Sequence, residues 1–173
     1  MSVGFDPRIL SEGVVDILPV FFSNEPGTLE RIGVQTKVFD PMDYGVASLG
    51  LTYIATREYV AKDPDAVQRF VTAVLHGIEY ADANPEEALD IVMKYASQED
   101  RDHQRFMLTT ELERAKTEST RTNGFGWQTL AQWQGLQDML LENQGIQNPV
   151  DPAKVFTDEF VRKAYADGDL ARP

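Results

Sequence analysis

Residues 14–33 read VVDILPVFFSNEPGTLERIG. A short apolar run rich in β-branched residues, positions 14–20, follows Gly13 and stops at a polar cluster. Such a run between turn-forming residues predicts a buried strand. Residues 25–32 then predict a short helix, which Gly33 ends because glycine readily adopts the left-handed conformation found just after helices. The stretch therefore predicts a strand followed by a helix, with polar side chains at the junction.

The first third of the chain alternates between strand and helix patterns, and the rest is helical. Alternation of this kind predicts an α/β fold with a small, mostly parallel sheet and helices on its faces. Helix starts are marked by Asp63-Pro64 and Asn84-Pro85, where proline occupies the first helical position. Further strands are predicted at 3–5, 36–39 and 47–56, further helices at 97–117, 128–143 and 157–166, and a polar, glycine-bearing loop at 119–126.

Composition narrows the classes of function. The chain has 173 residues, a net charge of −12 and no cysteine. Such an acidic chain with scattered Lys and Arg residues is not expected to bind nucleic acid. The absence of cysteine excludes disulfides, thiolate metal sites and cysteine nucleophiles. The sequence shows no membrane-spanning run and, at its start, no secretion signal.

A candidate ligand site lies where the strand at 14–20 ends. Ligands of open α/β sheets bind outside the carboxyl ends of the strands. Phe21 and Phe22 offer faces for stacking, and Ser23, Asn24 and Glu25 offer hydrogen-bond donors and acceptors. This mixture suits a small polar heterocycle. The alternative is that Asn24 only caps the helix, Glu25 complements its dipole and a phenylalanine fills the core.

A second candidate is the segment DPMDYG at 40–45, which follows the strand predicted at 36–39. Tyr44 can stack on a ligand or form a hydrogen bond with it. The alternative is a surface turn built by Asp, Pro and Gly.

Signals for catalysis are weak. His76 falls near the apolar stripe of a predicted helix and His103 falls in a charged helix, and neither has another ligand at metal-binding spacing. No nucleophile-elbow, phosphate-loop or dinucleotide-binding motif is present. We therefore predict no catalytic residue, no metal site and no cofactor.

Several segments of the chain, taken in their order, resemble segments of the solute-binding proteins of ABC importers, and more narrowly of the NMT1/THI5-like group. The most specific segment is DPDAVQRFVTAVLHGIEYADANPEEAL at 63–89. The segments GVVDILPVFFSNEP and DPMDYGV precede it, and GWQTLAQWQGLQDMLLENQGI and NPVDPAKVFTDEFVRKA follow it. Members of the group are usually much longer, and this chain resembles their second half only.

The resemblance implies a partial periplasmic-binding-protein type II fold. Residues 1–50 would form an α/β part of the second lobe, and residues 51–173 a returning strand and the carboxyl-terminal helices. It also implies location outside the cytoplasm and an ABC permease as partner of the full-length protein. Because part of the sheet would be absent, an uncovered apolar surface and self-association are expected.

The implied function is binding of a small heterocycle, such as a thiamine pyrimidine precursor, in a cleft between two lobes, without catalysis. Carried over residue by residue, the site comprises Ser23, Asn24 and Glu25, with Tyr44 in the second loop and Phe21 or Phe22 stacking on the ring. One alternative is a pyrimidine-synthesising enzyme of the same superfamily, which the lack of cysteine disfavours. Another is a helical interaction fragment that binds no ligand.

Overall fold

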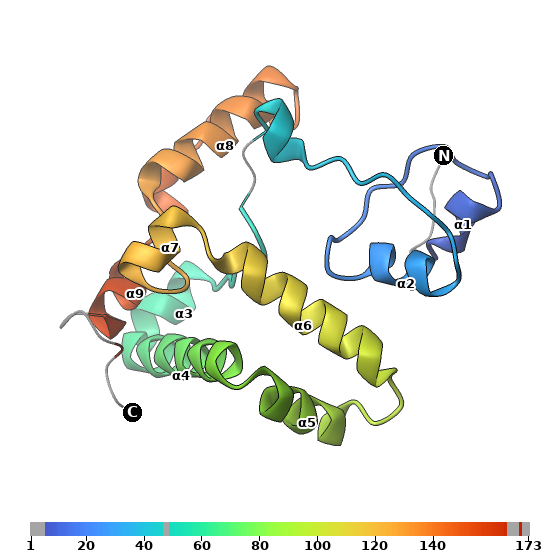
Figure 1. Ribbon diagram of the computed structural model, residues 1–173. Helices are drawn as coiled ribbons and strands as arrows, with labels where there is room; N and C mark the ends of the chain where they lie inside the picture. Colours follow the sequence, from blue (N-terminus) through green and yellow to red (C-terminus); the bar gives the residue numbers. More distant parts are fainter. Residues whose placement is uncertain (1–5, 47–48, 166–169, 171–173) are drawn as a thin grey trace. The chain divides into compact units, whose positions relative to one another are not determined.

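The computed structural model describes residues 6–46, 49–165 and 170. The regular structure in these residues is helical throughout (Figure 1). The elements are, in chain order, α1 (Arg8–Ser11), α2 (Glu25–Arg31), the 3₁₀ helix η1 (Pro41–Tyr44), α3 (Arg57–Lys62), α4 (Pro64–Ala83), α5 (Pro85–Tyr95), α6 (Arg101–Ala115), α7 (Glu118–Asn123), α8 (Leu130–Glu142), the 3₁₀ helix η2 (Pro152–Lys154) and α9 (Glu159–Ala164).

The prediction of an α/β fold, with the small sheet of a partial periplasmic-binding-protein type II fold, is wrong for the residues that the structure describes. Positions 14–20, 36–39 and 49–56 were predicted as strands and form no strand. A strand needs the backbone of a second strand to pair its N–H and C=O groups, and none of these segments meets one. The strand predicted at 3–5 and the start of the one at 47–56 lie outside the described residues.

The helix predictions fared better because their signals are local. Helices α4 and α5 begin at Pro64 and Pro85, as predicted. Helix α2 is followed by Gly33 with a positive φ of 78°, as expected for the residue beyond a helix end. The loop predicted at 119–126 is wrong in part, since α7 occupies 118–123. There Thr117 and Thr120 form a reciprocal capping box, which stabilises a helix start in a polar sequence.

The described residues belong to two compact units. The first unit comprises Met1–Val38 and Tyr80–Ala115, and the second comprises Phe39–Glu79 and Lys116–Pro173. In the first unit, α6 packs against both α5 and α2. Its buried apolar side chains are Leu29 of α2, Ala88 and Leu89 of α5, and Leu112 of α6.

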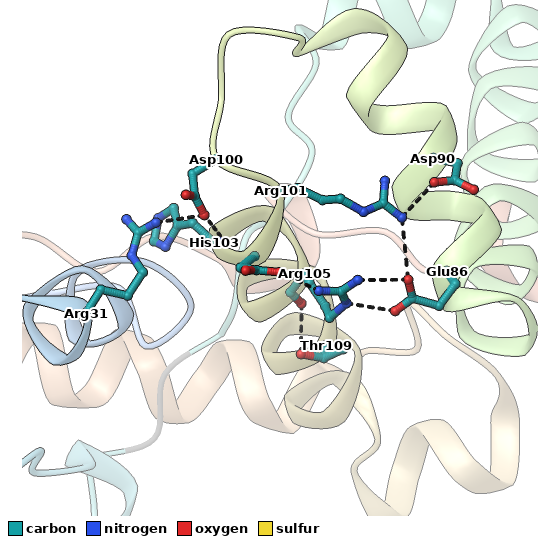
Figure 2. A network of polar contacts seen from close by, with 9 residues as sticks. Arg31, Glu86, Asp90, Asp100, Arg101, His103, Arg105 and Thr109 are labelled. Atoms are coloured by element: carbon teal, nitrogen blue, oxygen red, sulfur yellow. Dashed lines mark hydrogen bonds and ion pairs between the residues drawn. The ribbon is translucent and has the colours of Figure 1, made fainter.

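Ion pairs join α5 to α6 at the surface of the first unit (Figure 2). Arg105 donates to both carboxylate oxygens of Glu86, at 2.7 and 3.0 Å. Arg101 lies 2.6 Å from an oxygen of Asp90. Such exposed pairs contribute little individually, but a bidentate guanidinium fixes the angle between two helices better than a single contact does.

The second unit has its own buried side chains. Leu75 of α4 and Phe160 and Ala164 of α9 are buried. Gln137 of α8 is also buried, and its Oε1 accepts the N–H of Val150 at 2.6 Å, which holds the segment before η2 against α8.

Candidate functional site

The predicted site residues 23–25 stand at the junction between an irregular segment and α2, in the first unit. Ser23 and Glu25 are buried, Glu25 with 7% of its surface exposed, and Asn24 is half-buried. Buried polar side chains need partners, because an unpaired one loses its hydrogen bonds with water. The partners found here come from the segment itself and from α6.

Glu25 is bonded by its own segment. Its Oε2 accepts the backbone N–H of Phe21 at 2.8 Å, and its Oε1 accepts from Asn24 Nδ2 at 3.3 Å. A carboxylate has about four acceptor positions on its two oxygens. Glu25 therefore keeps acceptor capacity for further donors after its fold contacts are made.

Asn24 occupies the N-cap position of α2, but its side chain makes no capping hydrogen bond. Its Oδ1 instead lies 2.8 Å from Nε2 of His103 on α6. The interpretation that Asn24 serves only as a helix cap is therefore wrong for its side chain. Glu25 does stand in the first turn of α2, as that interpretation expected.

Ser23 and Phe22 also contact α6. The hydroxyl of Ser23 donates to Oε1 of Glu111 at 2.5 Å. The guanidinium carbon of Arg114 lies 3.7 Å from the centre of the Phe22 ring, a cation–π contact. Phe21 differs from its neighbour, since 56% of its surface is exposed. Of the two aromatic rings, that of Phe21 is more accessible to a ligand.

Tyr44 lies in the second unit, at the end of η1. It is 69% exposed, and its ring is tilted against that of Phe39 with the centroids 6.4 Å apart. Asp40 accepts the N–H of Met42 at 3.0 Å, and Gly45 follows with a φ of 79°. This is the surface turn named as the alternative, and a ligand-binding role for Tyr44 stays a prediction.

Sequence reasoning missed the α6 side of this cluster. His103, Phe106, Glu111 and Arg114 of α6 contact the residues around the start of α2. The steps of three from 103 to 106 and from 111 to 114 place each of these two pairs on one face of the helix. These four side chains differ in chemistry, so no sequence pattern marks them as one set. The sequence does not identify the segment that α6 contacts either, because the His103–Asn24 contact joins residues 79 positions apart.

A second set of charges fixes the start of α6. Asp100 accepts the backbone N–H of His103 at 2.7 Å, and Arg31 of α2 lies 2.8 Å from the same carboxylate (Figure 2). The hydrogen bond from His103, aided by the charge of Arg31, holds the pKa of Asp100 below its ordinary value. These contacts tie the end of α2 to the first turn of α6.

Metal binding and membrane crossing find no support in the part of the chain that the structure describes. No cluster of three or more His, Cys, Asp or Glu side chains there could hold a metal ion. None of the helices described combines the length and the apolar character needed to cross a bilayer.

Comparison with known proteins supplies the remaining observations. The profile of a family described as NMT1/THI5 like matches residues 2–88. The riboflavin-binding protein RibY of Chloroflexus aurantiacus is 32% identical over 165 residues, covering 92% of this chain and 46% of that protein. The formylaminopyrimidine-binding protein of Halalkalibacterium halodurans is 26% identical over 166 residues, covering 91% of this chain and 49% of that protein. The chain thus spans about half the length of these relatives, and no solved structure matches it significantly.

Proposed function

The chain belongs to the NMT1/THI5-like family, and on that premise we propose that it acts in a solute-binding component of an ABC importer, outside the cytoplasm. The ligand class is a planar nitrogen heterocycle. Two relatives support this class, because one is named for binding riboflavin and the other for binding formylaminopyrimidine. Both are binding proteins by name, and this chain has no cysteine for the enzymatic alternative.

The observation that carries the proposal is the environment of Glu25. Its carboxylate is buried and held by the N–H of Phe21 and the amide of Asn24, and it retains acceptor positions. An amino group and a ring N–H of a heterocycle are the donors that such a carboxylate would accept. The exposed ring of Phe21, four positions away, offers a stacking face, and base-like rings stack on aromatic side chains with about 1–3 kcal/mol each.

Ligand binding is tested by thermal shift and by calorimetry with riboflavin, formylaminopyrimidine, thiamine and a small sulfonate. A ligand at 100 times its dissociation constant stabilises the folded state by about 2.7 kcal/mol. We expect riboflavin or formylaminopyrimidine to raise the melting temperature and the sulfonate to leave it unchanged. If none of the four compounds binds, the proposed function is wrong.

The role of Glu25 is tested by Glu25→Gln. The amide oxygen of glutamine still accepts the N–H of Phe21, whereas its amino group cannot accept from Asn24, so the fold should persist with one hydrogen bond fewer and without the negative charge. We expect the variant to lose the shift caused by an aminopyrimidine. Glu30→Gln, on the exposed side of the same helix, is the matched control and should bind normally. Undiminished affinity in Glu25→Gln would remove Glu25 from the site and leave the binding function standing.

We further propose that the chain associates with a second copy through its uncovered apolar side chains, in addition to an importer permease as partner. Ile17 is 80% exposed in the first unit and Ile54 is 93% exposed in the second. Isolated apolar residues are common at surfaces, but Leu51 and Tyr53 beside Ile54 are exposed as well. Light scattering after size exclusion should show a dimer or larger species that Ile54→Lys shifts toward monomer. A wild-type monomer at all concentrations would contradict the proposal.

A further inference from the structure

His103 is the buried titratable residue closest to the candidate site. Only 9% of its surface is exposed. Its ring stacks beside that of Phe106, with the centroids 6.3 Å apart and the planes 18° apart. Its Nε2 lies 2.8 Å from Oδ1 of Asn24. Its backbone N–H is bonded to Asp100, as Figure 2 shows.

The partners of Asn24 determine where the histidine ring carries its proton. Asn24 Nδ2 donates to Oε1 of Glu25, which identifies the other amide atom, Oδ1, as the acceptor. The hydrogen bond with His103 therefore requires a proton on Nε2. A neutral ring then has a lone pair on Nδ1, and Nδ1 is buried without a hydrogen-bond partner among the residues that the structure describes.

We propose that His103 is a positioning residue for the candidate site: it orients Asn24, and through Asn24 the carboxylate of Glu25. The inference rests on the proposed function. The hydrogen bonds run from His103 Nε2 to Asn24 Oδ1, from Asn24 Nδ2 to Glu25 Oε1, and from the Phe21 N–H to Glu25 Oε2. Without the histidine, the amide of Asn24 could turn freely, and one side of the carboxylate would lose its fixed donor.

Packing alone does not explain a histidine at this position. The ring stacks on Phe106, which a phenylalanine would do without leaving an unpaired nitrogen in the interior. An unsatisfied buried acceptor lowers stability. Asp100 bonds to the backbone of residue 103, which any residue except proline provides. Among the contacts of His103 with described residues, the contact with Asn24 is the one that requires a side-chain donor.

Three variants separate positioning from packing. His103→Phe keeps an aromatic ring against Phe106 and removes the donor. His103→Gln retains an amide N–H near the place of Nε2. His76→Gln alters the other histidine of the chain, which lies on α4 in the second unit, and is the control.

Affinity is measured by calorimetry with riboflavin and with formylaminopyrimidine as the two probes. We expect His103→Phe to remain folded and to bind the recognised probe at least about tenfold more weakly, a loss equal to about 1.4 kcal/mol. His103→Gln should regain most of that affinity, and His76→Gln should bind like the wild type. A His103→Phe variant that folds and binds with wild-type affinity would overturn the proposal.

A second measurement needs no ligand, so that failure of the proposed function and failure of this inference can be told apart. Nitrogen NMR of the histidine rings should show that neutral His103 carries its proton on Nε2. Hydrogen exchange at the Phe21 amide should be faster in His103→Phe and near wild type in His103→Gln, because that amide is bonded to the carboxylate that Asn24 orients. An Nδ1–H tautomer, or unchanged exchange in His103→Phe, would refute the positioning role whatever the probes do.

Discussion

Replacing Gly27 by alanine tests the packing of α2 on α6, on which the candidate site depends. A Cβ atom at residue 27 would stand 2.5 Å from Cδ1 and 2.6 Å from Cε1 of Phe106. Carbon atoms in contact are ordinarily separated by about 3.5–4.0 Å. The Phe106 ring cannot yield without disturbing its stacking on His103, so the clash is transmitted to the residue that contacts Asn24.

The expected magnitude is a balance of two opposing effects. Adding a methyl group to a filled space costs about 1–3 kcal/mol. Glycine is less favourable than alanine in a helix by up to about 1 kcal/mol, which offsets part of this cost. We therefore expect Gly27→Ala to lower the free energy of unfolding by about 1 kcal/mol.

Gly77→Ala is the matched control. Gly77 lies within α4, and a Cβ there would meet no atom within 4 Å. Only the helix preference operates at this position, so the variant should be stabilised by about 0.5–1 kcal/mol. The same chemical change is therefore expected to have opposite signs at the two positions.

Urea denaturation followed by circular dichroism measures both variants, and hydrogen exchange of α2 and α6 localises the effect. The two tryptophans of the chain, Trp127 and Trp133, belong to the second unit, so their fluorescence reports on Gly77→Ala. Combining Gly27→Ala with Phe106→Leu should cost less than the sum of the single changes, by at least about 0.5 kcal/mol. Equal stabilisation by Gly27→Ala and Gly77→Ala would refute the packing of α2 against the Phe106 ring.

Three further predictions concern charges and backbone. The hydrogen bond from Arg105 lowers the pKa of Glu86, so this pair stabilises the fold above the ordinary carboxyl range; melting temperatures of wild type and Glu86→Gln should differ at neutral pH and converge in acid, below about pH 4. Gly124→Ala should destabilise the second unit by at least about 1 kcal/mol in tryptophan-monitored unfolding, because φ is 97° and a Cβ would lie 2.4 Å from Cζ of Tyr165. Burial and the charge of Glu79 raise the pKa of Tyr165, so its neutral form stabilises the fold until the pH rises through that raised pKa. When tyrosine ionisation is followed by absorbance in alkali, Tyr165→Phe should remove a step that occurs at higher pH than the ionisation of an ordinary tyrosine.

The helix starts could be predicted because a few adjacent residues determine them. Proline at the first position of α4 and α5 needs no partner elsewhere in the chain. The start of α6 shows the limit of such signals. The helix was predicted to begin at residue 97, whereas α6 begins at Arg101, and Asp100 just before it accepts the N–H of His103.

The strand predictions failed because an apolar, β-branched run indicates only that its side chains favour burial. Whether it forms a strand depends on a second backbone at pairing distance, and that is a property of the whole assembly. Ile17 and Ile54 come from two such runs and are largely exposed in the structure. The apolar pattern therefore identified segments that could pair as strands. It could not reveal that no second strand pairs with them among the described residues.

The sequence singled out residues 23–25 but not the residues that contact them, and a ligand-binding role for them stays a prediction. The structure places Ser23 and Asn24 against α6, and all three residues 23–25 form hydrogen bonds within the protein. Their partners His103 and Glu111 lie 79 and 88 positions further along the chain. Long-range docking of two helices decides such pairings, and the residues near position 24 contain no information about it.

The bonding of Glu25 to its own segment makes binding experiments on this site decisive. A carboxylate whose only role was structural would be largely replaceable by glutamine, which still accepts the N–H of Phe21 and loses only the hydrogen bond from Asn24. A carboxylate that also binds a ligand would lose that second role in the same variant. A small loss of stability together with lost binding in Glu25→Gln is therefore the pattern that separates a ligand site from a helix start. His103→Phe should also weaken binding, because it removes the other partner of the Asn24 amide.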